Sequence, residues 1–113
     1  MKYISLDDDE LGSEEYLRIV SSEEKHWKSI EDFYLSTFDS YPFIDRGDLS
    51  TFNSEIANKA QYVSRLSGFL LEHHEITLIG DELLITLCDD WNEQDYIIAI
   101  GPLYIRYYWE TGA

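Results

Sequence analysis

The sequence predicts an α+β domain in which two main N-terminal helices pack on one face of a C-terminal antiparallel sheet of three to five strands. Apolar residues between positions 27 and 38, and again between 52 and 70, recur at the three- and four-residue spacing of a helical face. From residue 75 onward the pattern is extended, with glycine-containing turns between apolar runs. Helices followed by consecutive strands are typical of α+β proteins, and the length of 113 residues fits a single domain over 1–113.

The first 20 residues are compatible with more than one element. Tyr3, Ile4 and Leu6 fit a short strand, and residues 16–20 fit either a helical turn or a strand. An acidic run and a turn-like Leu-Gly-Ser sequence separate the two segments. Both interpretations therefore stay open for this part of the chain.

The first helix is predicted to begin at Ser21, because a serine followed three residues later by Glu24 forms a capping-box pattern. It should end near Tyr41-Pro42, since a residue before proline is disfavoured in the helical conformation. Its predicted apolar face consists of large side chains: Trp27, Ile30, Phe33, Tyr34 and Phe38.

The second helix is predicted to begin at Asp48 or Ser50, after a loop over residues 41–48, and to end near His73 and His74. A positive imidazole at this end would suit the helix dipole. Burial against the sheet is expected from one stripe of residues: Phe52, Ile56, Ala60, Val63, Ser67 and Leu70.

The strands are expected in the last third of the chain. Residues 75–79 and 82–88, on either side of Gly80-Asp81, predict a hairpin. After a loop over residues 89–95, two further extended runs flank Gly101-Pro102, as a second hairpin or as one strand broken by a bulge: residues 96–100 and 103–109.

The chain is strongly acidic and rich in aromatic residues. It has 23 Asp and Glu against 8 Lys and Arg, a net charge of −15, and is 15% aromatic. A disordered acidic segment would be poor in aromatic residues, so the composition predicts a folded domain with a negative surface. Such a surface repels nucleic acids and anionic membranes and favours a positively charged protein partner. Direct nucleic-acid binding and membrane association are therefore not expected.

Cysteine content and hydropathy predict a cytoplasmic protein. Cys88 is the single cysteine and cannot form an internal disulfide, which favours a reducing compartment. No stretch approaches the roughly 18 apolar residues of a membrane span. The N-terminal segment has no apolar run after Lys2 of the kind found in a signal peptide.

The first candidate partner-binding site is the acidic segment over residues 89–95. Carboxylates on both sides of a tryptophan, in a connection between strands, are typical of an interface anchor for a basic cleft. The alternative is a solvated loop whose tryptophan packs on the core. The candidate residues are Asp89, Asp90, Trp91, Glu93 and Asp95.

The second candidate is the acidic run Asp7, Asp8, Asp9 and Glu10, which is either a partner contact or a solvated turn. This run lacks the ligand spacing of a calcium loop. His73 and His74, which follow each other directly in the sequence, lack the spacing of a zinc-binding helix. No base, nucleophile and oxyanion donor can be assembled. We therefore expect no metal, no cofactor and no enzymatic activity.

Besides the segment with Trp91, two further aromatic segments are candidates for an exposed binding surface. Alternation over residues 104–109 places Arg106 and two tyrosines on one side of a strand, which is either core or an exposed patch. Tyr41-Pro42-Phe43 is a third exposed aromatic possibility.

A small, acidic, aromatic-rich domain with one cysteine and no catalytic constellation resembles the immunity proteins of bacterial toxin systems, including the contact-dependent growth inhibition type. The resemblance implies neutralisation of a cognate toxin, commonly a cationic nuclease, in the cytoplasm by a negative surface that covers its active site. Two alternatives remain open. One is a nucleic-acid mimic that inhibits a DNA-processing enzyme, and the other is a small enzyme whose acidic residues meet only in the fold.

Overall fold

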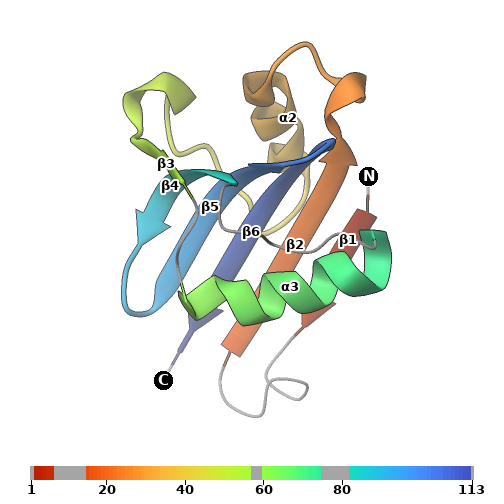
Figure 1. Ribbon diagram of the computed structural model, residues 1–113. Coiled ribbons are helices and arrows are strands. Elements are labelled where there is room, and N and C mark those ends of the chain that lie inside the picture. Colours follow the sequence, from red (N-terminus) through yellow and green to blue (C-terminus); the bar gives the residue numbers. More distant parts are fainter. Residues whose placement is uncertain (1, 7–14, 57–59, 75–81, 113) are drawn as a thin grey trace.

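The computed structural model describes residues 2–6, 15–56, 60–74 and 82–112. It contains a six-stranded antiparallel sheet with the order β1-β2-β6-β5-β4-β3 (Figure 1). The strands are β1 (Lys2–Leu6), β2 (Glu15–Glu23), β3 (Ser54–Ile56), β4 (Leu83–Asp89), β5 (Glu93–Ile100) and β6 (Leu103–Thr111).

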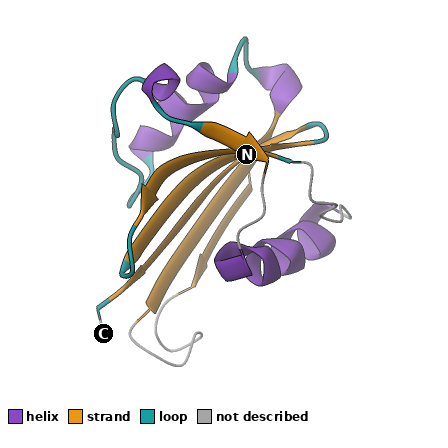
Figure 2. Ribbon diagram, turned by 60° about the vertical axis from the view of Figure 1, so that its left-hand side comes forward, coloured by secondary structure: helices purple, strands orange, loops and turns teal. Residues whose placement is uncertain are grey.

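The helices lie on both faces of this sheet (Figure 2). The long helix α3 (Ala60–His74) covers one face. The other face is covered by α2 (Ile30–Ser36) with the short 3₁₀ helices η2 (Thr37–Asp39) and η3 (Leu49–Thr51). A further 3₁₀ helix, η1 (Glu24–His26), follows the end of β2 and has no buried residue.

The α+β class and the antiparallel sheet are confirmed. Two details differ from the prediction: the helices do not share one face, and the sheet exceeds five strands because the N-terminal segments form β1 and β2. Ile97 and Ile98 are neighbours in β5 and both have 0% exposure. Since neighbouring residues in a strand point to opposite faces, both faces must be covered.

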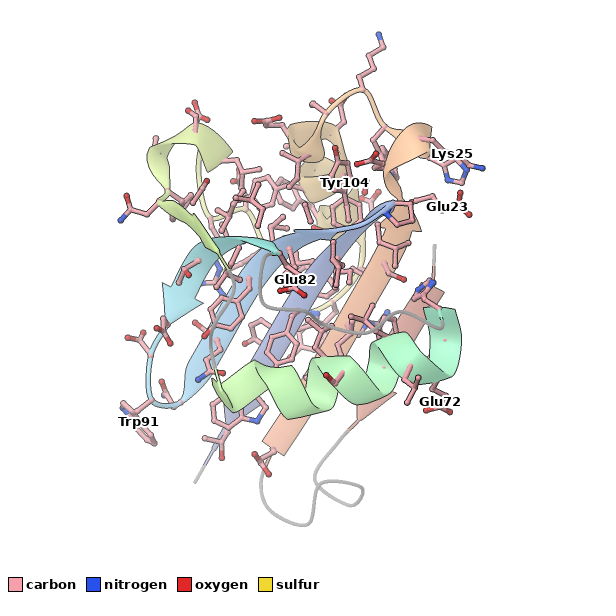
Figure 3. All side chains as sticks on the ribbon, in the orientation of Figure 1. Glu23, Lys25, Glu72, Glu82, Trp91 and Tyr104 are labelled. Atoms are coloured by element: carbon pink, nitrogen blue, oxygen red, sulfur yellow. The ribbon has the colours of Figure 1, made fainter. Side chains whose placement is uncertain are left out.

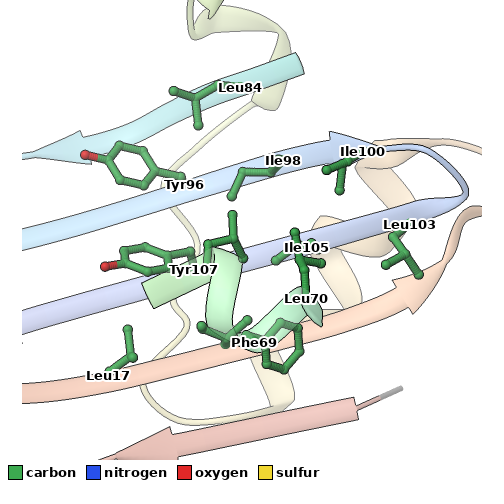
Figure 4. Close-up of a cluster of buried hydrophobic side chains, with 12 residues drawn as sticks. Leu17, Phe69, Leu70, Leu84, Tyr96, Ile98, Ile100, Leu103, Ile105 and Tyr107 are labelled. Atoms are coloured by element: carbon green, nitrogen blue, oxygen red, sulfur yellow. The ribbon is translucent and has the colours of Figure 1, made fainter. Parts of the chain in front are cut away.

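The α3 face carries an apolar core (Figure 4). Leu66, Phe69 and Leu70 project from α3 onto side chains of β2, β4, β5 and β6. Burial of each such side chain contributes about 1.5–3 kcal/mol. The sheet residues of this core are Leu17, Ile19, Leu84, Tyr96, Ile98, Ile100, Leu103, Ile105 and Tyr107.

The opposite face, called the α2 face from here on, carries an aromatic core. All five residues of the predicted first apolar face belong to it. The predicted helix start at Ser21 is wrong, however, because Ser21 is a buried residue of β2 that pairs with both β1 and β6. The helix begins at Ile30 instead, and the Ser29 hydroxyl accepts a hydrogen bond from the Asp32 amide at 3.4 Å. Strand pairing outweighed the local capping pattern.

The predicted second helix also starts later than expected. Asp48 caps only the single turn of η3, by accepting from the Ser50 amide, and the chain then forms β3 against β4 before α3 begins at Ala60. The predicted end at His74 is confirmed. The predicted strand over residues 75–79 lies outside the described residues. Of the two alternatives at Gly101-Pro102, the structure shows the hairpin, as the β5–β6 connection.

Candidate functional site

The turn between β4 and β5 is short and firmly attached to the sheet. The strands end at Asp89 and resume at Glu93, so only residues 90–92 connect them, and the loop predicted over 89–95 is wrong in its extent. The Asp90 amide donates to the Glu93 carbonyl at 2.8 Å. The Thr111 amide of β6 donates to the Asn92 carbonyl at 3.0 Å. These bonds attach the turn to β5 and β6 at one end of the sheet.

Trp91 projects from this turn into solvent. Its exposed fraction is 76%, and its side chain points away from the sheet and from α3 (Figure 3). The alternative in which this indole packs on the core is therefore wrong. Asp89 and Asp90, which precede it, are also exposed. The turn thus presents a large apolar ring among carboxylates.

Asp95 does not belong to this surface. It has 0% exposure and lies on the α2 face, where its carboxylate accepts from Arg106 at 3.0 and 2.7 Å and from Arg46 Nε at 3.0 Å. Its assignment as a partner-binding residue is a prediction that the structure corrects. Bidentate pairing compensates the loss of hydration of both buried charges.

Arg106 is the centre of a buried cluster that also contains Asp95, Arg46 and Thr37. Its guanidinium donates to the Thr37 hydroxyl at 2.7 Å and to the Ile44 carbonyl at 2.9 Å. It also lies 5.1 and 5.0 Å from the ring centroids of Tyr34 and Phe43. The possibility that Arg106 forms an exposed patch is excluded by its 0% exposure.

Glu93 links the buried cluster to the surface. Its carboxylate lies 3.4 Å from Arg46 Nη2 and accepts from the Tyr108 hydroxyl at 2.8 Å and from the Cys88 thiol at 3.3 Å. Burial acts to raise the pKa of Glu93, but these bonds and the charge of Arg46 lower it below its ordinary value. Glu93 is therefore ionised at neutral pH.

The neighbours of Glu93 are held in their protonated forms. Burial and the adjacent Glu93 carboxylate raise the pKa of the Cys88 thiol to about 12. Burial, with the carboxylates of Glu110 and Glu93, raises the pKa of Tyr108. Burial acts to lower the pKa of Arg46, but the hydrogen bond and the charge of Asp95 raise it. The thiol and the phenol therefore stay neutral and Arg46 stays cationic near neutral pH, and none of these groups is an activated nucleophile.

Two glutamates that the sequence analysis missed lie at the same end of the sheet. Glu110 is directly opposite Glu93 in the β5–β6 ladder. Glu15 begins β2 opposite Thr111 and accepts from the Trp109 indole at 2.9 Å. Only the strand register brings Glu15 and Glu110 to the same end of the sheet as Glu93. The position of Glu110 directly after an alternating run was a sequence signal that it lies at a strand end. We call the resulting surface the acidic end: Glu15, Asp89, Asp90, Trp91, Glu93 and Glu110.

The second predicted cluster, Asp7, Asp8, Asp9 and Glu10, lies outside the described residues. Leu6 ends β1 and Glu15 begins β2, and both lie at the same end of the sheet as the acidic end. The partner contact of this run stays a prediction.

Among the residues that the structure describes, no group of three or more His, Cys, Asp or Glu side chains is placed to hold a metal ion. No helix in the same part of the chain is long and apolar enough to cross a membrane.

Comparison with known proteins gave no match to any protein-family model, to any curated protein or to any solved structure.

Proposed function

We propose that this protein is an immunity protein that binds a cognate, cationic nuclease toxin in the cytoplasm and covers its active site with the acidic end. The observation that carries the proposal is Trp91, exposed among acidic side chains on a turn that is hydrogen-bonded to the sheet. Because the protein neutralises its partner by binding, it needs no catalytic residue of its own.

The charge of the protein suits such a partner. A nuclease that holds a phosphodiester uses Lys, Arg or His to neutralise phosphate and transition-state charge. Carboxylates of the acidic end can occupy that positive field without being cleaved. With a net charge of −15, the protein is also attracted over a distance, which accelerates association and orients the encounter.

Trp91 supplies the apolar part of the interface. Tryptophan is among the residues that contribute most to binding when they insert into a pocket of the partner. Its indole gains little from the fold, because 76% of its surface remains exposed. Carboxylates around it would then form a polar rim that pairs with basic residues of the toxin.

The buried cluster below the turn supports this role. Asp95 fixes β5 to β6 through Arg106, and Arg46 connects both Asp95 and Glu93 to the loop that follows α2. A rigid surface loses little conformational entropy when it binds. The acidic end is therefore preorganised for binding.

Affinity capture with the purified protein as bait, at low and at high salt, tests the proposal. We expect capture of a basic domain at low salt, weaker capture at high salt, and loss of that domain's nuclease activity when one equivalent of this protein is added. A captured DNA-processing enzyme without toxin activity would support the nucleic-acid mimic instead. Undiminished nuclease activity in a stable complex would contradict active-site inhibition.

A further inference from the structure

A second exposed aromatic side chain lies beside the acidic end on the α2 face. Tyr41 has an exposed fraction of 75%, and its ring meets that of Tyr16 edge-on, with centroids 6.0 Å apart. The loop that carries it crosses the sheet: Phe43 packs against Tyr108 of β6, and Arg46 pairs with Glu93 of β5. Tyr41 is thus held at one edge of the same surface.

A row of side chains leads from this aromatic pair into the acidic end. Tyr16 of β2 is directly opposite Glu110 of β6, which in turn is directly opposite Glu93 of β5. All three lie on the α2 face, because residues paired across an antiparallel ladder share a face. Tyr16 is therefore a neighbour of both Tyr41 and Glu110.

Glu110 carries an incompletely compensated charge. Like charges directly opposite in a ladder repel each other, and Glu110 faces Glu93. Both carboxylates lie 2.8 Å from the Tyr108 hydroxyl, which has one proton and can donate to only one of them. Arg46 pairs with Glu93, whereas no described basic side chain lies within ion-pair distance of Glu110. A cation from outside would compensate this charge.

We propose that Tyr16, Tyr41 and Glu110 form a second contact of the partner-binding surface, which receives an arginine or lysine side chain. The cation pairs with the Glu110 carboxylate while its apolar stem and charge contact the tyrosine rings. This inference rests on the proposed function, since it adds a contact to the same interface. A second copy of this chain does not fit, because each copy carries a charge of −15.

A hexa-arginine peptide titrated into ¹⁵N-labelled protein tests the second contact without the toxin. We expect the largest amide shift changes at Tyr16, Tyr41 and Glu110, in addition to those of the turn at Trp91. Shift changes confined to the turn, or spread evenly over all acidic residues, would overturn the inference.

Two variants distinguish a specific contact from general attraction. We expect Tyr41→Ala to weaken peptide binding about threefold to fivefold at unchanged net charge. Glu110→Gln should weaken it at least as much, with no loss of thermal stability, because the amide removes the repulsion from Glu93. Leu71→Ala, at a 65% exposed position of α3, is the matched control and should bind as the native protein does.

The outcome with the captured nuclease separates this inference from the proposed function. Loss of affinity with Trp91→Ala but not with Tyr41→Ala or Glu110→Gln would refute the second contact and leave the immunity role standing. Native affinity for all three variants would refute the acidic end as the interface.

Discussion

Asp95 and Asp90 belong to the same short acidic segment, yet one is fully buried between two arginines and the other is exposed beside Trp91. The alternation of β5 turns Asp95 toward the α2 face, where Arg106 is its counter-charge. Asp90 lies beyond the strand end, outside the ladder. The two regions show that one acidic segment supplies both a structural ion pair and a surface that is free to bind.

The two regions also differ in how much they matter to folding. Removing one partner of a buried pair leaves an uncompensated charge in a poorly solvated place. An exposed carboxylate remains hydrated in the folded and the unfolded protein, so its removal changes stability little. Asp90 therefore owes little to stability, which is consistent with a role in binding.

The largest expected effect is on the buried cluster. Asp95→Asn should lower the free energy of unfolding by about 3–5 kcal/mol, because Arg106 and Arg46 lose their shared counter-charge. Urea denaturation measures this difference, with Asp90→Asn as the control, which should stay within about 0.5 kcal/mol of the native protein. If Asp95→Asn fails to fold, the double variant Asp95→Leu with Arg106→Met should regain a folded state. Equal midpoints for Asp95→Asn and Asp90→Asn would contradict the comparison.

The next effect is on binding through Trp91. Trp91→Ala should weaken affinity for the captured nuclease about 30-fold, corresponding to about 2 kcal/mol, because the central apolar anchor is lost. Calorimetric titration gives the dissociation constant, and an unchanged melting temperature verifies that the fold is intact. Leu71→Ala serves again as the exposed apolar control, and a similar loss in both variants would argue against a specific anchor.

A smaller effect is expected from the exposed carboxylates. Replacing Asp89 and Asp90 together by Asn should slow association about tenfold at low salt and make the rate less sensitive to ionic strength. Asparagine at 89 still accepts the hydrogen bond of the Tyr96 hydroxyl, so folding is preserved. Stopped-flow mixing at two salt concentrations provides the measurement, and an unchanged salt dependence would exclude these residues from the encounter.

The smallest effect concerns pH. Because the pKa of Glu93 is lower in the folded protein than in the unfolded chain, its contribution to stability is present above the unfolded value of about 4.3 and is lost as pH falls through the folded value. Melting temperatures between about pH 3 and pH 7 should therefore decline less steeply on acidification in Glu93→Gln. Parallel curves for the two proteins would show that Glu93 contributes no pH dependence.

The sequence reveals the features of this fold that are local. The apolar residues predicted between Trp27 and Phe38 all lie in the aromatic core, and α3 ends at His74 as predicted. Of the two alternatives at Gly101-Pro102, the structure shows the hairpin. All three features depend on residues close together in the chain. The pairing of β2 with both β1 and β6 joins distant segments. Because of this pairing, Ser21 belongs to a strand and does not cap a helix. The placement of the helices on opposite faces of the sheet also depends on packing between distant segments.

The same division applies to the site. The exposure of Asp89 and Asp90 could be predicted, because a polar turn between two apolar runs leaves its charged side chains outside. For Trp91 the sequence left exposure and packing on the core both open, and the structure shows the exposed alternative. The burial of Asp95 could not, since its arginine partners arrive through the β5–β6 register and the loop after α2. Glu110 was missed for the same reason.

The most direct test of the central claim is inhibition of the captured nuclease by a variant that combines Asp89→Asn, Asp90→Asn and Trp91→Ala. These residues lie outside both cores, so we expect the variant to melt at the temperature of the native protein. If the acidic end covers the toxin's active site, the variant leaves the nuclease active at one equivalent, where the native protein abolishes its activity. Complete inhibition by the folded variant at one equivalent would contradict the claim.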